Sequence, residues 1–541
     1  MCFVVLASGL ALGQTATNGS AGQGSVAEEL KALREAISEQ QKQIAQQQQQ
    51  IQTLEQRLQD KTSGTPHVAE ATLHTAAPAT NVVQETEKPK ESPLSFRIGG
   101  TEFTPGGFVD FENIFRSTNT TGAAATTFGG IPFSNSVQGH LTEFRMTGQY
   151  SRYNLKVSGK YGANNVVGYI EGDFNGNDAT NVFVTSNSHT NRLRLYWLDL
   201  KRGEWEFLGG SSWGLETPNR KGLSPNPADL MLTIGEDANV HVGVPYTRAA
   251  LFRAVIHPND NFAWGVEVQN PQQFIGTGEV IFPFAFNAQL TNQFDTGVST
   301  TSGIPNAFPD ILTKFAYDTN HIHFEAGGMM TSVKINVPLV VTPPPVTGAP
   351  FQSHSKIGGG IMAGANAEVF KNFRLIGHGM WGNGIGRYLI GSGPNAVVFP
   401  VATSPTPGNF DADISLVHSG SLIVGAEATA RKSQFGFYYG GFYFQRNAPL
   451  DITNPVPNRF AGFGGPNSPT SANRAIQEAS IEWTQTFWKN PQYGAVLLVT
   501  QASYLTRAPW FIPKDAVSGQ LLAPKNAHLG MGYLSVRYVL P

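Results

Sequence analysis

Long stretches of the chain alternate between apolar and polar residues, the pattern of β-strands with two different faces. In GYLSVRYVLP, residues 532–541, one face carries Leu534, Val536, Tyr538 and Leu540, and the other includes Ser535 and Arg537. A strand with an unpaired edge invites aggregation. We therefore expect this strand to pair with the first one and close a barrel.

Other segments predict strands in the same way. YNLKVSGKY (153–161) separates Tyr153, Leu155 and Val157 from Lys156, and RLRLYW (192–197) separates Leu193, Leu195 and Trp197 from Arg192, Arg194 and Tyr196. The alternation changes phase at residues 151–152. We interpret this change as a β-bulge within one strand, because a turn there would disturb the order of joints described next.

The connections between the predicted strands, called joints below, alternate between short and long along residues 94–541. Seven short joints carry turn residues, at 162–165, 201–203, 258–261, 318–320, 371–372, 431–432 and 489–491. Eight long joints rich in Gly, Pro, Asn and Ser lie between them, at about 116–139, 175–191, 214–247, 271–309, 334–354, 385–413, 447–472 and 507–526. Fifteen joints separate sixteen strands, and this even number with unequal joints is typical of bacterial outer-membrane barrels. The predicted fold is all-β: a 16-stranded antiparallel transmembrane β-barrel preceded by an α-helical coiled coil.

The coiled coil is expected over residues 25–60, where apolar residues recur every seven positions. Its seams contain Leu30, Leu33, Ile37, Ile44, Ile51, Leu54 and Leu58. A seam needs a partner helix, so we expect these residues to hold an oligomer together. The heptads alone leave dimer and trimer open.

The segments around the coil are of two other kinds. Residues 1–13, MCFVVLASGLALG, resemble the apolar part of a signal peptide, and we expect its start to be truncated, since no charged region precedes them. Residues 61–93 are poor in large apolar groups and predict a flexible linker. With both barrel ends on the short-turn side, the coil is expected in the periplasm.

Composition narrows the class of protein. Only 14% of the residues are charged, against about 25% in soluble domains. No internal apolar run approaches the ~18 residues of a transmembrane helix. The net charge of −2 gives no reason to expect a nucleic-acid partner, and a single cysteine, Cys2, excludes disulfides and cysteine-based metal sites.

Several motifs occur in a recognisable order: the short coiled coil, then GGFVDF, SRYNL, VGYIEGDF, NRLRLYW and FLGGSSWGLETPN. In this order the chain resembles the DcaP-like trimeric porins of Gram-negative outer membranes over most of residues 25–225. The resemblance implies sixteen strands, a periplasmic coiled coil, a homotrimer embedded in outer-membrane lipid, and passage of small anionic solutes. It implies no enzymatic activity and no cofactor.

Candidate selectivity residues are the charged side chains expected to face the lumen, because a pore selects ions at its narrowest ring of charge. They are Arg145, Lys156, Arg192, Arg194, Arg253, Glu171 and Asp173 on strands, and Arg220 and Lys221 in the loop 214–247, which we expect to fold into the lumen. Guanidinium groups can hold carboxylates or phosphates in a fork. The alternative is that Arg192 and Arg194 form wall ion pairs with Glu171 and Asp173.

The sequence motifs that would indicate enzymatic catalysis or metal binding are weak. Gly210–Gly214 matches G-x-S-x-G, but no helix pattern follows. His321, His323 and Glu325 share a face, where pairing is a simpler role than metal binding. The sequence thus predicts a passive porin for small, dicarboxylate-like anions. The alternatives are a phosphate-selective porin and an outer-membrane structural or tethering protein.

Overall fold

The computed structural model describes Lys42 and residues 92–122, 124–176, 189–226, 236–237, 239–276, 278–296, 304–338, 350–403 and 409–541. The predicted signal peptide, nearly all of the coiled coil and most of the linker lie outside the described residues. The seam residues Leu30, Leu33, Ile37, Ile44, Ile51, Leu54 and Leu58 are among them, so their role stays a prediction.

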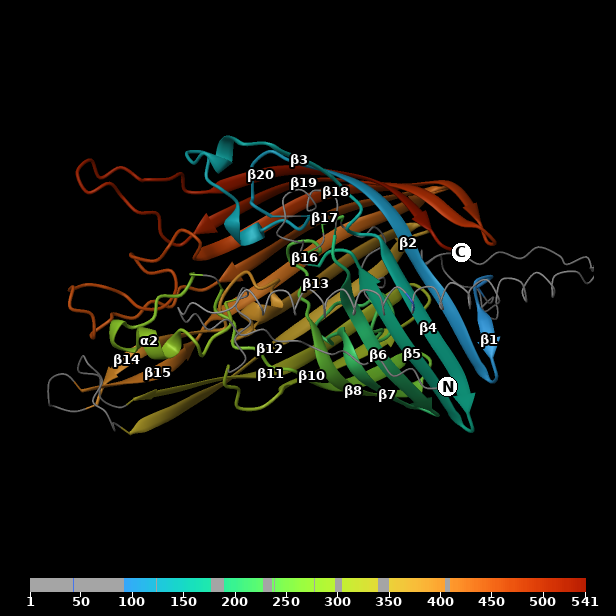
Figure 1. The fold of residues 1–541 in the computed structure, drawn as a ribbon, viewed down its shortest axis with the longest axis horizontal. Helices are drawn as coiled ribbons and strands as arrows, with labels where there is room; N and C mark the ends of the chain where they lie inside the picture. Colours follow the sequence, from blue (N-terminus) through green and yellow to red (C-terminus); the bar gives the residue numbers. More distant parts are fainter. Residues whose placement is uncertain are drawn as a thin grey trace, which may run out of the picture. The chain divides into compact units, whose positions relative to one another are not determined.

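The wall is a closed antiparallel barrel of sixteen strands, as predicted (Figure 1). Its first half consists of β2 (Thr101–Arg116), β3 (Glu143–Thr147) with β4 (Arg152–Tyr161), β5 (Asn164–Asp173), β6 (Arg192–Arg202), β7 (Trp205–Trp213), β8 (Arg248–Asn259), β9 (Phe262–Gln269) and β10 (Asp310–Asp318). Its second half consists of β11 (Ile322–Pro338), β12 (Phe351–Phe370), β13 (Phe373–Asn383), β16 (His418–Ala430), β17 (Ser433–Phe444), β18 (Asn473–Asn490), β19 (Gly494–Pro509) and β20 (Ala527–Val539). β20 pairs with both β19 and β2, which closes the ring.

β3 and β4 form one interrupted wall strand, as the change of phase in the sequence predicts. Both pair with β2, at Glu112↔Thr147 and at Phe108↔Arg152. Between these pairs lie three residues on β2 (109–111) and four on the other strand (148–151), so one residue is extra. The extra residue moves the apolar face from even to odd positions.

The alternation on β6 differs from the prediction. Leu195 is fully buried and Trp197 stacks on Tyr169 inside the barrel, whereas Tyr196 is exposed on the outer face. The pairing of β5 with β6 shifts register between Glu171 and Gly172, and the resulting bulge reverses the facing after Arg194. A period-two pattern cannot reveal such a reversal by itself.

The two ends of the barrel differ in their connections. Seven turns of two or three residues close one end, and eight long loops lie at the other, where Figure 1 shows α2, β14 and β15. The remaining elements are the short β1 (Phe96–Ile98) beside β2, the hairpin β14 (Ala396–Ala402) and β15 (Phe410–Leu416), α2 (Asn287–Leu290), and the 3-10 turns η1 (Phe128–Gly130), η2 (Gln138–His140), η4 (Phe284–Phe286) and η5 (Gly386–Tyr388). None of the helices in the described ranges is long and apolar enough to cross a membrane.

The outer face of the barrel is apolar and uncovered. Phe252, Ile361 and Phe370 are each more than 70% exposed, and many other large apolar side chains of the wall share this outer face. Inside, buried apolar residues come mainly from the inward wall positions and from the long loops that pack on them. An apolar outside with a largely polar inside is the arrangement of a barrel surrounded by lipid.

Candidate functional site: a loop-lined constriction

The first part of loop L3 (residues 214–247) is fastened to the wall by carboxylates that accept its backbone N–H groups. Asn219 N donates to Glu325 Oε2 on β11 at 3.2 Å. Gly222 N donates to Asp318 Oδ2 on β10 at 3.0 Å. A loop inside a barrel has no ladder partner, so wall side chains must satisfy its backbone.

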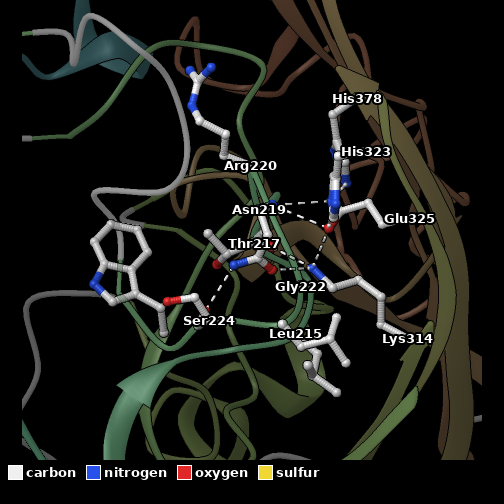
Figure 2. Close-up of polar contacts among 12 residues, drawn as sticks. Leu215, Thr217, Asn219, Arg220, Gly222, Ser224, Lys314, His323, Glu325 and His378 are labelled. Carbon is white, nitrogen blue, oxygen red and sulfur yellow. Dashed lines mark hydrogen bonds and ion pairs between the residues drawn. The ribbon is translucent and has the colours of Figure 1, made fainter. Parts of the chain in front are cut away.

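A buried ion pair supports the same part of the loop (Figure 2). Lys314 Nζ lies 2.9 Å from Glu325 Oε2 and is almost fully buried. It also donates to the carbonyl of Thr217 at 2.7 Å and to Asn219 Oδ1 at 2.8 Å. All three donors of the ammonium group are therefore used, which is the condition for burying a charge without a large penalty.

Of the three residues considered as a metal site, His323 and Glu325 lie together, whereas His321 lies apart from them. His323 Nε2 lies 3.3 Å from Glu325 Oε2, and its Nδ1 lies 2.8 Å from Asp318 Oδ1. His321 belongs to the turn before β11, where its Nδ1 is 3.4 Å from Glu368 Oε2. His323 and Glu325 thus have a pairing role within the wall.

The last part of L3 contacts the opposite side of the wall. Val242 N donates to Glu478 Oε2 on β18 at 2.9 Å. The hydroxyl of Tyr533 on β20 donates to Asp237 Oδ2 at 2.7 Å. Since the first part of the loop is held by β10 and β11, the described parts of L3 reach opposite sides of the wall from inside the barrel, as the sequence suggested.

Glycines allow this crossing loop to touch the wall. A Cβ atom on Gly440 of β17 would lie 1.9 Å from the carbonyl oxygen of Val242. Gly243, at φ +102°, packs on the same point, where its own Cβ would lie 2.9 Å from Gly440 Cα. Val240 and Val244 then pack beside Ile423 and other buried residues of the wall. The contact is therefore backbone against backbone, and only glycine permits it.

The structure brings four of the predicted selectivity residues together, in the arrangement given above as the alternative. Arg192 Nη2 lies 2.7 Å from Asp173 Oδ2. Arg194 bridges both acids, with Nε 2.8 Å from Glu171 Oε1 and Nη1 2.9 Å from Asp173 Oδ2. The group contains two cations and two anions, so its field cancels at a distance.

The other predicted arginines of the loop region are also compensated. Arg220 forms a bidentate pair with Glu427 of β16, at 3.0 and 2.9 Å. Arg253 Nε donates to Glu267 Oε2 at 2.8 Å, and its remaining nitrogens donate to backbone carbonyls of L3 and β7. Both guanidinium groups are buried, and each forms hydrogen bonds that join L3 to the wall.

Three predicted cations remain without an ion pair in the described part of the chain. Arg145 faces inward opposite Ile114, and Lys156 faces inward opposite Tyr169. Lys221 is an exposed residue of L3. These three, unlike the paired arginines, keep a charge that a passing ion would meet.

Sequence reasoning missed three further arginines of the lumen. Arg537 lies 2.9 Å from Glu236 of L3 and also pairs with Asp110. Arg152 and Arg248 have no ion-pair partner among the described residues. Arg537 could have been found from its phase opposite Val536. Arg152 directly follows the bulge and Arg248 directly follows a long loop, and at such positions alternation gives no signal.

Several solved structures of outer-membrane channels are similar to this barrel. The outer-membrane channel DcaP of Acinetobacter baumannii superposes with a TM-score of 0.53 at 16% sequence identity, over 83% of this chain and 100% of that one. An anion-selective porin from Comamonas acidovorans gives 0.43 at 12%, over 81% and 100%, and OmpF of Salmonella typhi gives 0.42 at 11%, over 83% and 100%. The sequence matches no protein-family model and no curated protein.

The barrel has the DcaP-like porin fold. In this porin fold, Ser212 of the G-x-S-x-G segment lies on β7, and its hydroxyl donates to the carbonyl of Pro225 at 3.3 Å. The strand–turn–helix elbow that a nucleophilic serine needs does not occur at this point, because L3 follows β7 directly.

Two carboxyl groups of L3 have raised pKa values inside this barrel. Burial raises the pKa of Glu216 to about 7, and the neighbouring carboxylate of Glu267 adds to the effect. Burial also raises the pKa of Glu236 to about 7, although the guanidinium of Arg537 opposes it. The charge of the constriction therefore changes near neutral pH.

Proposed function

We propose that the protein is an outer-membrane porin of the DcaP-like family, through which small anionic, dicarboxylate-like solutes diffuse passively. The observation that carries the proposal is a difference in how accessible the unpaired charges inside the barrel are. Five inward cations without an ion pair in the described ranges are half-buried or exposed: Arg145, Arg152, Lys156, Lys160 and Arg248. Six inward acids are buried and bound to a basic side chain: Asp110, Glu171, Asp173, Glu267, Glu325 and Glu427. The acids inside the barrel that have no ion pair among the described residues are buried as well: Glu112, Asp199, Glu216 and Asp237.

This difference in accessibility supports anion preference although the overall charge does not. Residues 94–541 contain 30 Lys and Arg and 29 Asp and Glu, a balance of +1 (30 − 29). An ion pair contributes little potential beyond its own length, whereas an unpaired cation in a narrow lumen acts on every passing ion. The potential that a solute meets is therefore set mainly by the unpaired cations that are accessible from the lumen.

The assembly is part of the proposal. The heptads between Leu30 and Leu58 require partner helices, and the DcaP-like resemblance favours three protomers. On this view the coil lies in the periplasm, and the apolar outer face of the barrel lies in lipid.

The test is the reversal potential of the purified protein in a planar bilayer under a KCl gradient. We expect anion selectivity at low salt that decreases as salt rises, because screening shortens the reach of the lumen charges. Liposome swelling should be faster with succinate than with its uncharged diamide. A channel that is cation-selective at low salt would overturn the proposal and leave the barrel fold intact.

A further inference from the structure

A polar cavity of about 690 Å³ opens at the loop end of the barrel, where L3, the start of β8 and the long loops 270–309 and 384–417 meet. Its lining contains two arginines, four carboxamides and one carboxylate: Arg248, Arg387, Asn239, Asn270, Gln272, Asn306 and Asp295. The formal balance of these groups is +1 (2 − 1). Cavities of about 300–1,000 Å³ are the usual size for small-molecule sites.

Arg248 is the group in this lining whose charge is available to a solute. It starts β8, and its guanidinium carbon lies 5.8 Å from the ring centroid of buried Trp213. It forms no ion pair with any described residue. Stacking on an indole fixes a guanidinium without using its hydrogen-bond donors, so the fork is left for another acceptor.

The second arginine has a different position. Arg387 donates from both Nη1 and Nη2 to the carbonyl of Asn270 at 3.1 Å, and its Nη1 lies 3.4 Å from Asp310 Oδ2. Gln272 donates from its side-chain amide to the carboxylate of Asp295. These contacts hold Arg387 and Asp295 in the lining, where they shape the cavity and leave Arg248 as its main anion ligand.

We propose that this cavity is an entry subsite, which binds the carboxylate or phosphate group of a solute before the solute reaches the constriction. Arg248 would hold the oxyanion in a fork, and the carboxamides of Asn270 and Asn306 would bind the polar remainder. The proposal rests on the proposed function and adds a specific site to it. It also explains why an unpaired arginine stands at the first residue of β8, on the route from the loop end to L3.

The experiment records single channels formed by the full-length protein at low salt. It measures how often and for how long each solute blocks the current. Succinate, inorganic phosphate and uncharged succinamide are added separately to each side of the bilayer. We expect succinate or phosphate to produce resolved blockades from one side, and Arg248→Gln to shorten their dwell time by about tenfold. Comparison of the two anions shows whether carboxylate or phosphate is the better ligand.

Lys371→Gln is the matched control, since it removes one exposed positive charge in the short turn between β12 and β13. It should leave the dwell time within about twofold. An unchanged dwell time in Arg248→Gln, or equal blockade by succinamide, would overturn the subsite. Failure of the proposed function has a different signature, which is a wild-type reversal potential that indicates cation selectivity.

Discussion

The contact between Gly440 and L3 gives a sharp test of the loop's position. In Gly440→Ala the new methyl carbon would lie 1.9 Å from Val242 O, whereas ordinary contact begins near 3.4 Å. The loop must therefore withdraw by about 1.5 Å (3.4 − 1.9), because β17 is held by hydrogen bonds on both sides. The bond from Val242 N to Glu478 Oε2 would lengthen from 2.9 Å to about 4.4 Å (2.9 + 1.5) and break.

The free-energy cost of losing this hydrogen bond can be predicted. A hydrogen bond to a charged group contributes about 1.5–3 kcal/mol, which corresponds to roughly 10- to 150-fold in the ratio of seated to unseated loop. We expect single-channel recordings of Gly440→Ala to show frequent excursions to higher conductance, since an unseated loop leaves a wider lumen.

The control is the neighbouring residue. A Cβ atom on Gly441 would lie 3.4 Å from Ile476 O and 3.5 Å from the Gln477 side chain, which is ordinary contact. Gly441→Ala should therefore behave as wild type. Circular dichroism and heat-modified gel mobility establish that both variants form barrels. If two folded variants gave identical conductance and noise, the described contact between L3 and β17 would be wrong.

Four further results are expected. Arg152→Gln should shift the reversal potential toward cations, more at low salt than at high salt, because this inward cation has no ion pair in the described residues; no shift would contradict the pairing argument. Glu427→Gln should leave Arg220 buried and uncompensated, at a cost of about 3 kcal/mol, and raise channel noise, with partial recovery when Arg220→Gln is added. Because burial raises the pKa of Glu236 to about 7, anion preference should fall as the pH rises from 6 to 8, and Glu236→Gln should make that pH profile of reversal potential less steep, the remainder being due to Glu216. Deletion of residues 14–60 should leave a folded barrel whose oligomers dissociate more readily in mild detergent, and unchanged heat resistance of the oligomer would exclude an assembly role for the coil.

The barrel was predictable because its signals are local. Each short joint falls on turn residues, and the structure places Asn372 and Arg431 there at φ +65° and +57°. The bulge between β3 and β4 was readable because it changes the phase of a long apolar face. The bulge at Arg194 was not readable, because the residues after it include both aromatic and aliphatic side chains that fit either face.

The site was less predictable because its contacts join distant segments. Charge and phase indicate that Glu325 faces the lumen, but they cannot indicate that its partners are Asn219 N, 106 residues away, and Lys314 on the adjacent strand. In the same way, the sequence predicts Arg220 as a free charge in the lumen, whereas in the structure it pairs with Glu427, 207 residues away. Inward facing is a local property, whereas pairing depends on how the loop crosses the barrel.

Loop folding and lumen charge are therefore linked in this molecule. Wall acids such as Asp318, Glu325 and Glu478 accept backbone N–H groups of L3, so their charge is used to hold the loop. Unpaired cations such as Arg152 and Arg248 have no comparable partner in the described residues. A loop that left the lumen would expose those acids again and shift the potential toward negative. A variant that releases L3 should consequently become both wider and less anion-selective, a pair of effects that loss of a lumen arginine alone would not produce.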